Sequence, residues 1–360
     1  MKTLPPQSQS KQQKSSRQGG LFCALPLALA LLFGSAPLPA GGGPCTPPFS
    51  GTIFIDPDII LPTDPTTHLA TTPTGQGQRT VFDRRSGWIT MNAYLFEATY
   101  SDGPPIEVQV NPEFGSVAAA EGFALQYASA VGQLPRVLRE DIDELWIHAG
   151  VFPFGGGNDS ILIHTGQGAN YIANGILEET LVHEAVHTSL DAVHGSAPAW
   201  LAAQAQDNCF ISTYARDNPT TEDVAESYLT ALAVTIRADR ISTALAQTIE
   251  AAIPARLAYF AAQDFDLFPL VQEFRRGDSN LDGSVNLADA IAILDHLFGG
   301  SPIGCEDAGD SNDDGALNLA DPIFLLGYLF SGESAPSAPG LNCGTDPSAD
   351  SLSCAPHPCS

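Results

Sequence analysis

The strongest constraint on this chain is a segment that occurs twice in its C-terminal part, with a spacing of 32 residues. The sequence GDSNLDGSVNLAD at 277–289 returns as GDSNDDGALNLAD at 309–321. Each copy places oxygen-bearing residues at loop positions 1, 3, 5, 9 and 12 and glycine at position 6, which is the spacing of a calcium loop. An apolar run follows each copy, at 290–298 and 322–330. We therefore expect two calcium loops, each leading into a helix.

The repeat also predicts which residues hold the two structural calcium ions. The alternative is a pair of acidic turns, but the repetition of the whole spacing favours calcium. The expected ligands are Asp278, Asn280, Asp282, Ser284, Asn286 and Asp289 in the first loop and Asp310, Asn312, Asp314, Ala316, Asn318 and Asp321 in the second.

This duplicated loop and helix resembles a type I dockerin, in which the loop ends in Asp instead of the Glu of an EF-hand. The resemblance implies a small α-helical module that folds on binding calcium and attaches its protein to a cohesin on a scaffold or surface. The pairs before the final Asp are Leu287-Ala288 and Leu319-Ala320, where many cellulosomal dockerins carry Ser or Thr. A calcium-stiffened spacer is therefore an alternative role.

A second motif, His183-Glu184-Ala185-Val186-His187, lies in a helix-forming run from about 174 to 193. Residues four apart share one face of a helix, so both imidazoles can reach one metal ion, and Glu184 lies beside them to act on a water. This spacing also arises by chance in helices with solvated or core histidines. Here the surrounding residues are apolar, so these polar groups lie on a mostly buried element and need partners.

A third ligand is expected from an acidic segment further along the chain. Asn218 followed by Pro219 is typical of a helix start, which predicts a helix from there to about residue 238. Glu222 and Glu226 then lie one turn apart on one face. Glu222 could complete a zinc site with the two histidines, and Glu226 could accept the other ring N–H of a ligating histidine. We expect Asp223 to be solvated.

The two helices together resemble the gluzincin metallopeptidases, and Tyr214, Asn218, Glu222 and Glu226 resemble the lethal-factor-type branch of that group. The resemblance covers about 60 residues. It implies His183, His187 and Glu222 as zinc ligands, Glu184 as general base and Tyr214 as a stabiliser of the oxyanion. Glu226 would be a carboxylate behind the ligands. The resemblance also implies that the strand before the motif helix, Ser160 to His164, is the sheet edge that pairs with a peptide.

His194 is the rival candidate for the third ligand. His194 lies seven residues after His187, one more than a metzincin site requires, and Leu190 replaces the glycine of that pattern. We expect His194 at the surface and Asp191 to orient a ligand or make local contacts. His148 and His164 are expected to be structural or surface residues.

The first 40 residues have the composition of an export signal. A basic leader with all three lysines of the chain precedes an apolar run, Leu21 to Phe33, that is short for a membrane span. Without this leader, 11 arginines face 41 acidic residues, a formal charge of −30. That charge argues against nucleic acid and anionic membranes as partners. It suits a secreted protein that binds calcium and has no membrane span once the signal is removed.

Six cysteines remain after the leader, an even number that predicts disulfides in an exported chain. We expect Cys45 to pair with Cys209. Two more bridges are expected among the four C-terminal cysteines: Cys305, Cys343, Cys354 and Cys359.

The remaining sequence predicts an α+β fold with a small mixed sheet. Strands are expected within 79–83, 88–100, 106–110, 143–148 and 160–164, with a helix at 116–131, and the Pro/Thr-rich stretch 46–73 is expected to wrap the surface. The domains would be an export signal (1–40), a zincin-like metallopeptidase domain (46–272), a dockerin-like module (275–333) and a Cys/Pro-rich tail (334–360).

The function expected from these features is secreted, zinc-dependent hydrolysis of peptide bonds in a peptide or protein substrate. One alternative is a catalytically idle zincin-like binding or structural protein, displayed through the calcium module to a cohesin-like partner. Another is a zinc hydrolase that acts on a non-peptide amide. The presence of Glu184 beside both histidines favours an active site over an idle one, because a purely structural site has no need of a base.

Overall fold

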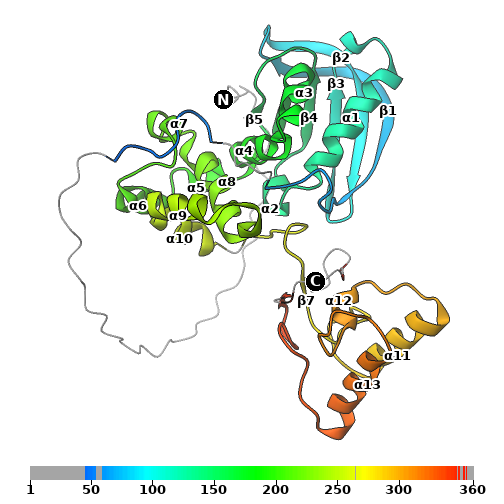
Figure 1. Cartoon of the computed structure of the whole chain (residues 1–360). Coiled ribbons are helices and arrows are strands. Elements are labelled where there is room, and N and C mark those ends of the chain that lie inside the picture. Colours follow the sequence, from blue (N-terminus) through cyan, green and yellow to red (C-terminus); the bar gives the residue numbers. More distant parts are fainter. Residues whose placement is uncertain are drawn as a thin grey trace, which may run out of the picture.

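The computed structural model describes residues 45–53, 59–263 and 265–346, together with residues 348, 352 and 354. The expected export signal and Cys359 lie outside these residues. The chain has a mixed α+β architecture, as the sequence predicts, and Figure 1 shows a sheet with helices beside it and a smaller group of helices near the C-terminus.

Six strands form one mixed sheet in the order β1-β2-β3-β4-β6-β5. The pairs β1–β2, β2–β3 and β6–β5 are antiparallel, and β3–β4 and β4–β6 are parallel. The strands are β1 (His68–Asp83), β2 (Gly87–Tyr100), β3 (Gly103–Val110), β4 (Glu144–His148), β5 (Gly155–Gly157) and β6 (Ser160–His164).

Two predictions about the sheet are wrong. β1 begins at His68, so part of the Pro/Thr-rich stretch expected to wrap the surface is instead the outer half of a long hairpin with β2. The reason is that backbone pairing with the apolar strand β2 stabilises β1, although many side chains of β1 remain in solvent. In addition, Ser160–His164 is not the sheet edge, because β4 pairs with one side of it and β5 with the other. The edge next to the motif helix is β5.

Helices cover one face of the sheet and form a group of their own beside it (Figure 1). Successive side chains of a strand point to opposite faces of the sheet. Leu145 and Ile147 of β4 therefore pack in the main core, whereas Trp146 packs in a smaller cluster on the opposite face. The helices of this part are α1 (Val117–Val131), α2 (Arg136–Arg139), α3 (Thr165–Ala173), α4 (Leu177–Ser189), α5 (Asp191–His194), α6 (Pro198–Asp207), α7 (Thr213–Asp217), α8 (Asp223–Thr235), α9 (Thr243–Ala252) and α10 (Pro254–Ala261).

The two helices of interest are both present but shorter than expected. α4 ends at Ser189, and the chain resumes in the short helix α5 after Leu190. α8 begins at Asp223 with Glu222 as its N-cap, whereas Asn218 ends α7 and so does not start the long helix. The prediction failed there because Asn is favoured at both ends of a helix.

The C-terminal part contains β7 (Glu273–Phe274), α11 (Leu287–Leu294), α12 (Glu306–Gly309), α13 (Ala320–Leu326) and β8 (Gly344–Thr345). α11 and α13 follow the two predicted loops and pack against each other. The tail joins this part through antiparallel pairing of β7 with β8. The buried guanidinium of Arg276 also donates to the carbonyl oxygens of Ala338 and Asp310.

Two disulfides are present among the described residues. Cys45 is bonded to Cys209, as the sequence predicts, and Cys305 is bonded to Cys354, one pairing within the predicted C-terminal set. Cys343 is also disulfide-bonded.

Candidate metal centres

The motif helix α4 is buried along almost its whole length between β5 and α8. It packs tightly against β5 at Gly156, where a Cβ atom would lie 1.8 Å from the carbonyl oxygen of Glu184. Only glycine allows this contact. The glycine run at the sheet edge therefore brings β5 directly against the turn of α4 that carries His183, Glu184 and His187.

The first candidate centre is formed by one face of α4 and the start of α8. Nε2 of His183 and Nε2 of His187 lie 3.2 Å apart. Oε2 of Glu222 lies 3.4 Å from the first nitrogen and 3.2 Å from the second. The structure thus brings together the three side chains that the sequence predicts as ligands, and all three are buried.

These three distances suit a tetrahedral zinc ion. Bonds of about 2.0–2.1 Å to nitrogen and oxygen place two ligand atoms of a tetrahedron roughly 3.3 Å apart. Oε2 of Glu222 is buried and has no hydrogen-bond partner among the described residues, which is costly for a carboxylate unless an ion or a proton compensates it. The donor set of two imidazoles and one carboxylate leaves a fourth position open.

The protonation of two of the three ligands suits metal binding. Burial lowers the pKa of His183 to about 4, which keeps its imidazole neutral. Burial raises the pKa of Glu222, but its contacts with His183 and His187 outweigh this and lower it to about 2. A neutral imidazole and an ionised carboxylate are the forms that bind a metal ion. Burial lowers the pKa of His187, but its contacts with Asp191 and Glu222 outweigh this and raise it to about 10, so a metal ion would have to displace a proton from that imidazole.

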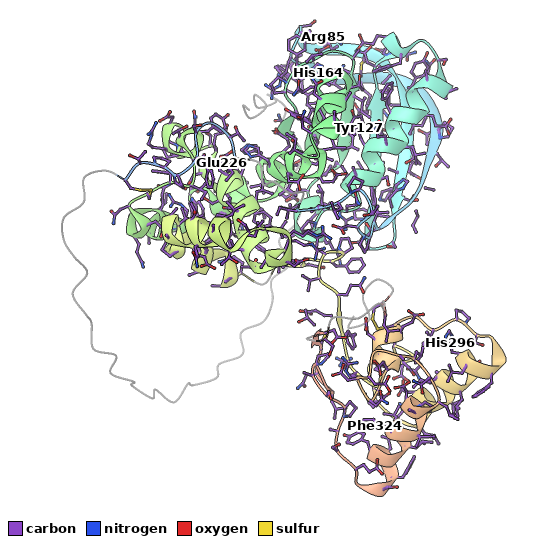
Figure 2. The ribbon with its side chains drawn as sticks, viewed as in Figure 1. Arg85, Tyr127, His164, Glu226, His296 and Phe324 are labelled. Atoms are coloured by element: carbon purple, nitrogen blue, oxygen red, sulfur yellow. A yellow bond between two sulfur atoms is a disulfide. The ribbon has the colours of Figure 1, made fainter. Side chains whose placement is uncertain are left out.

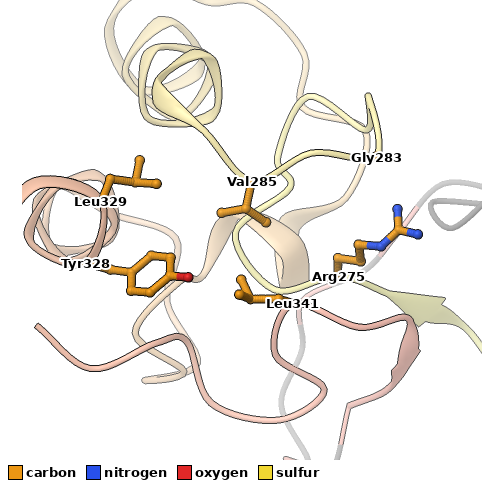
Figure 3. Close-up of a pocket in the computed structure, with 6 residues that line it drawn as sticks. All are labelled: Arg275, Gly283, Val285, Tyr328, Leu329 and Leu341. Carbon is orange, nitrogen blue, oxygen red and sulfur yellow. The ribbon is translucent and has the colours of Figure 1, made fainter. Parts of the chain in front are cut away.

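Carboxylates hold the other nitrogen of each histidine. Nδ1 of His187 lies 2.7 Å from Oδ2 of Asp191, and Nδ1 of His183 lies 3.5 Å from Oε1 of Glu226. Such partners fix the tautomer and the orientation of a ligating histidine. The geometry agrees with the orienting roles expected for Asp191 and Glu226. Glu226, labelled in Figure 2, lies on α8, the helix that begins directly after Glu222.

Glu184 has the surroundings of a proton acceptor. Its side chain is fully buried, and neither carboxylate oxygen has a hydrogen-bond partner among the described residues. Burial raises its pKa to about 7. A general base works best when its pKa lies near the working pH, so this carboxylate can both take up and release a proton in neutral solution.

Tyr214 comes from α7 and is half-buried beside the same centre. Its pKa is raised above the ordinary value by burial, by the negative charge of Glu222 and by a hydrogen bond with that carboxylate. The hydroxyl therefore stays protonated and can donate a hydrogen bond. The structure brings Tyr214 to the ligands, as the sequence predicts.

Asp223 and His194 are not where the sequence places them. Asp223 is buried instead of solvated, and it accepts hydrogen bonds from Arg256 Nε and Gln204 Nε2, both at 2.9 Å. His194 is buried instead of exposed, and its Nδ1 lies 2.5 Å from the hydroxyl of Tyr259. In both cases the partner is distant in sequence, so no local sequence pattern indicates that Asp223 and His194 are buried.

His148 and His164 lie away from the candidate zinc centre, at the ends of β4 and β6. Both are fully buried, in agreement with a structural role, and Asp83 lies within 3.6 Å of the first ring and 3.9 Å of the second. Figure 2 shows His164 near Arg85, which pairs with Asp83 and Glu113.

Two contributors were missed by the sequence interpretation. Ser212 Oγ and the backbone N–H of Ile53 both donate to Oε2 of Glu226, at 2.5 and 3.1 Å. Ser212 also caps α7 by accepting from Ala215 N, and a serine before a short helix is a usable signal for that role. A backbone N–H from a segment 173 residues away gives no signal in the sequence.

The two repeated loops form two further candidate centres. Each of the following hydrogen bonds in the first loop has a counterpart at the same position of the second loop. Asp278 accepts from the backbone N–H groups of Asp282 and Gly283, and Asp310 accepts from those of Asp314 and Gly315. Both position-6 glycines have positive φ, 84° and 77°. The loop glycines therefore make the tight turn expected of them.

The final aspartates of the two loops are buried, and their carboxylates accept hydrogen bonds from backbone N–H groups of the same loop. Asp289 accepts from Asn280 N and Asn286 N, and Asp321 accepts from Asn312 N and Asn318 N. Burial raises the pKa of Asp321 to about 6, and hydrogen bonding with Asp310 adds to this rise. A divalent cation would relieve the repulsion between such carboxylates. Asn286 and Asn318 instead direct their Oδ1 atoms to the backbone N–H groups that begin the following helices.

No known protein family, curated protein or solved structure matches this chain. Among the described residues no helix combines the length and the hydropathy that a membrane crossing requires. The function must therefore be inferred from the donor atoms and their surroundings.

Proposed function

We propose that this chain is a secreted zinc-dependent peptidase. The observation that carries the proposal is the convergence of His183 Nε2, His187 Nε2 and Glu222 Oε2 at mutual distances of 3.2–3.4 Å, next to the buried carboxylate of Glu184. The three converging atoms hold the metal, and the carboxylate without a hydrogen-bond partner acts on the water.

The chain's own residues then divide the work of hydrolysis. Zinc, when bound, supplies Lewis acidity that polarises a carbonyl group and acidifies water. Glu184 takes a proton from the attacking water and passes it to the leaving amine. Tyr214 donates a hydrogen bond to the developing oxyanion, and the loss of one such donor typically costs about 100- to 1000-fold in rate.

We assign the substrate backbone to the outer edge of β5, where Gly157 is partly exposed and Gly155 and Gly156 are buried. Among the described residues this strand pairs only with β6, and it is pressed against the turn of α4 that contains Glu184. An extended peptide can add to such an edge through main-chain hydrogen bonds, which brings its carbonyl groups toward the metal.

The C-terminal part acts as a calcium-dependent attachment module in this proposal. The matching hydrogen bonds of the two loops and their buried aspartates support two calcium sites. Exposed apolar side chains occur at matching positions of the two copies and support a role in contacting a cohesin-like partner. They are Leu287, Ile291 and Phe298 in the first copy and Leu319, Ile323 and Phe330 in the second.

The test is the metal content of the calcium-saturated protein and of its Glu222→Ala variant, with casein hydrolysis measured on both. We expect one zinc per chain in the wild type and loss of zinc and hydrolysis together in the variant. Glu250→Ala is the matched control, because Glu250 is an exposed glutamate on α9. A wild type without zinc, or a variant that keeps it, would overturn the proposal.

A further inference from the structure

The segment 45–53, here called the strap, runs along the beginning of α7. The carbonyl oxygen of Phe49 accepts from Thr213 N at 2.9 Å, and the backbone N–H of Gly51 donates to Thr213 Oγ1 at 2.7 Å. The carbonyl oxygen of Gly51 also accepts from Tyr214 N at 3.4 Å. The strap therefore holds the short helix that carries Tyr214.

The strap also reaches the carboxylate behind the metal ligands. The N–H of Ile53 donates to Oε2 of Glu226 at 3.1 Å, and Ser212 Oγ donates to the same oxygen at 2.5 Å. The other oxygen of Glu226 faces Nδ1 of His183 at 3.5 Å. Since Glu226 is almost fully buried, these two donors fix which way its carboxylate turns. One of the two depends entirely on the position of the strap.

A disulfide locks the upstream end of the strap. Cys45 is exposed, whereas its partner Cys209 is buried and held through its carbonyl oxygen, which accepts from the buried Arg256 Nη1 at 2.8 Å. The Cys209 end is therefore anchored in the core, and the bond transfers that anchoring to the strap. Without the bond, a few hydrogen bonds and the packing of Ile53 and Phe49 against the core would hold this segment, and its upstream end at Cys45 would be free to open.

We propose that the Cys45–Cys209 disulfide and Ser212 are positioning elements of the zinc centre, which act through the strap on Glu226 and on Tyr214 and thereby set the metal affinity. The inference rests on the proposed function only in requiring that His183, His187 and Glu222 bind a metal. A dithiol that reduces this disulfide transfers two electrons and two protons, forms the thiols of Cys45 and Cys209, and becomes a cyclic disulfide itself. The reduced chain then binds zinc more weakly.

The experiment measures the zinc dissociation constant by chelator competition for the wild type and for the double variant Cys45→Ser/Cys209→Ser. Removal of a partner behind a ligating histidine typically weakens metal binding by about 10- to 100-fold, and we expect about 10-fold here. The visible absorption of the cobalt-substituted proteins is recorded as well, because it reports ligand geometry directly. The control is Cys305→Ser/Cys354→Ser, which removes a disulfide from the calcium module and should leave zinc affinity unchanged.

Ser212 provides a second variant that leaves the disulfide in place. Ser212→Ala removes the other donor to Glu226 and should weaken zinc binding and change the cobalt spectrum, whereas Ser212→Thr keeps a hydroxyl and should restore both. If the cysteine variant does not fold, the Ser212 pair decides the question. Wild-type affinity and spectrum in Ser212→Ala, or in a folded cysteine variant, would overturn the inference. A wild type that binds no zinc would instead refute the proposed function.

Discussion

Replacement of Gly156 by alanine would test whether the contact between β5 and α4 supports catalysis. The new Cβ would lie 1.8 Å from the carbonyl oxygen of Glu184, 2.7 Å from its carbonyl carbon and 3.0 Å from its Cα. All three atoms belong to the backbone, so no side chain can rotate away. Ordinary contacts require roughly 3.2 Å or more, so strand and helix must separate by about 1.4 Å.

This separation predicts a loss of both stability and activity. Overpacking of this kind typically costs about 1–3 kcal/mol of the free energy of unfolding. A displacement of about 1 Å at the reacting groups can cost on the order of 100-fold in kcat, and Glu184 lies at the contact itself. We would measure unfolding in urea by tryptophan fluorescence, kcat on casein, and zinc content in the same preparations. Zinc content distinguishes misplacement of the base from loss of the metal.

Gly122→Ala is the matched control. Gly122 lies within α1, and a Cβ there would meet no atom within 4 Å, so this change should be neutral or slightly stabilising. Stability and kcat of Gly156→Ala equal to those of the control would refute the close packing of β5 on α4 and, with it, the placement of the substrate along β5.

Further predictions concern the base, two buried charges and calcium. Glu184→Gln should keep zinc and lose turnover, and residual wild-type kcat in a zinc-loaded preparation would rule out this base. Burial raises the pKa of Glu179 to about 7 from the ordinary 4.5, so the folded state retains a proton that the unfolded chain releases, and the contribution of this group to the free energy of unfolding should fall by about 3 kcal/mol as pH rises from 4.5 to 7. Glu179→Gln should flatten that part of the profile, and an unchanged difference between pH 4.5 and 7 would contradict the assignment. Arg256→Met should destabilise the helical part by about 3–5 kcal/mol, because it leaves the carboxylates of Asp207 and Asp223 buried without their cation; a loss below 1 kcal/mol in urea would argue against the buried network. Removal of calcium by dialysis against calcium-free buffer should remove helical circular dichroism from the C-terminal module without changing zinc content, and a spectrum insensitive to calcium removal would reject the calcium sites.

The sequence predicts those parts of the site whose residues recur at a regular spacing along the chain. His183 and His187 are four apart on a helix, and the two loops repeat their spacing, so helix geometry and ligand chemistry alone indicate both centres. Glu222 was predicted as a ligand although the start of its helix was misplaced, because it precedes α8 directly and remains on the side that faces α4.

The features that the sequence could not predict depend on partners far along the chain. Asp223 is buried because Arg256, 33 residues later, neutralises it. The orientation of Glu226 depends on Ile53, and β1 extends upstream to His68 because β2 is long enough to pair with it. Each of these features depends on a tertiary contact, which produces no periodic pattern in the sequence of either segment.

The long outer strand β1 has a consequence for solubility. It spans 16 residues at the edge of the sheet, and an exposed edge of that length can pair with the same edge of another molecule. Here its pairing with β2 is interrupted by register shifts between His68 and Ala70 and between Pro73 and Gly75, and Pro73 itself has no N–H to offer. These irregularities interrupt the outer edge of β1 over its first eight residues, whereas the part from Gln76 to Asp83 keeps a regular register. Edge-to-edge pairing with another molecule is therefore hindered at the upstream end of the strand.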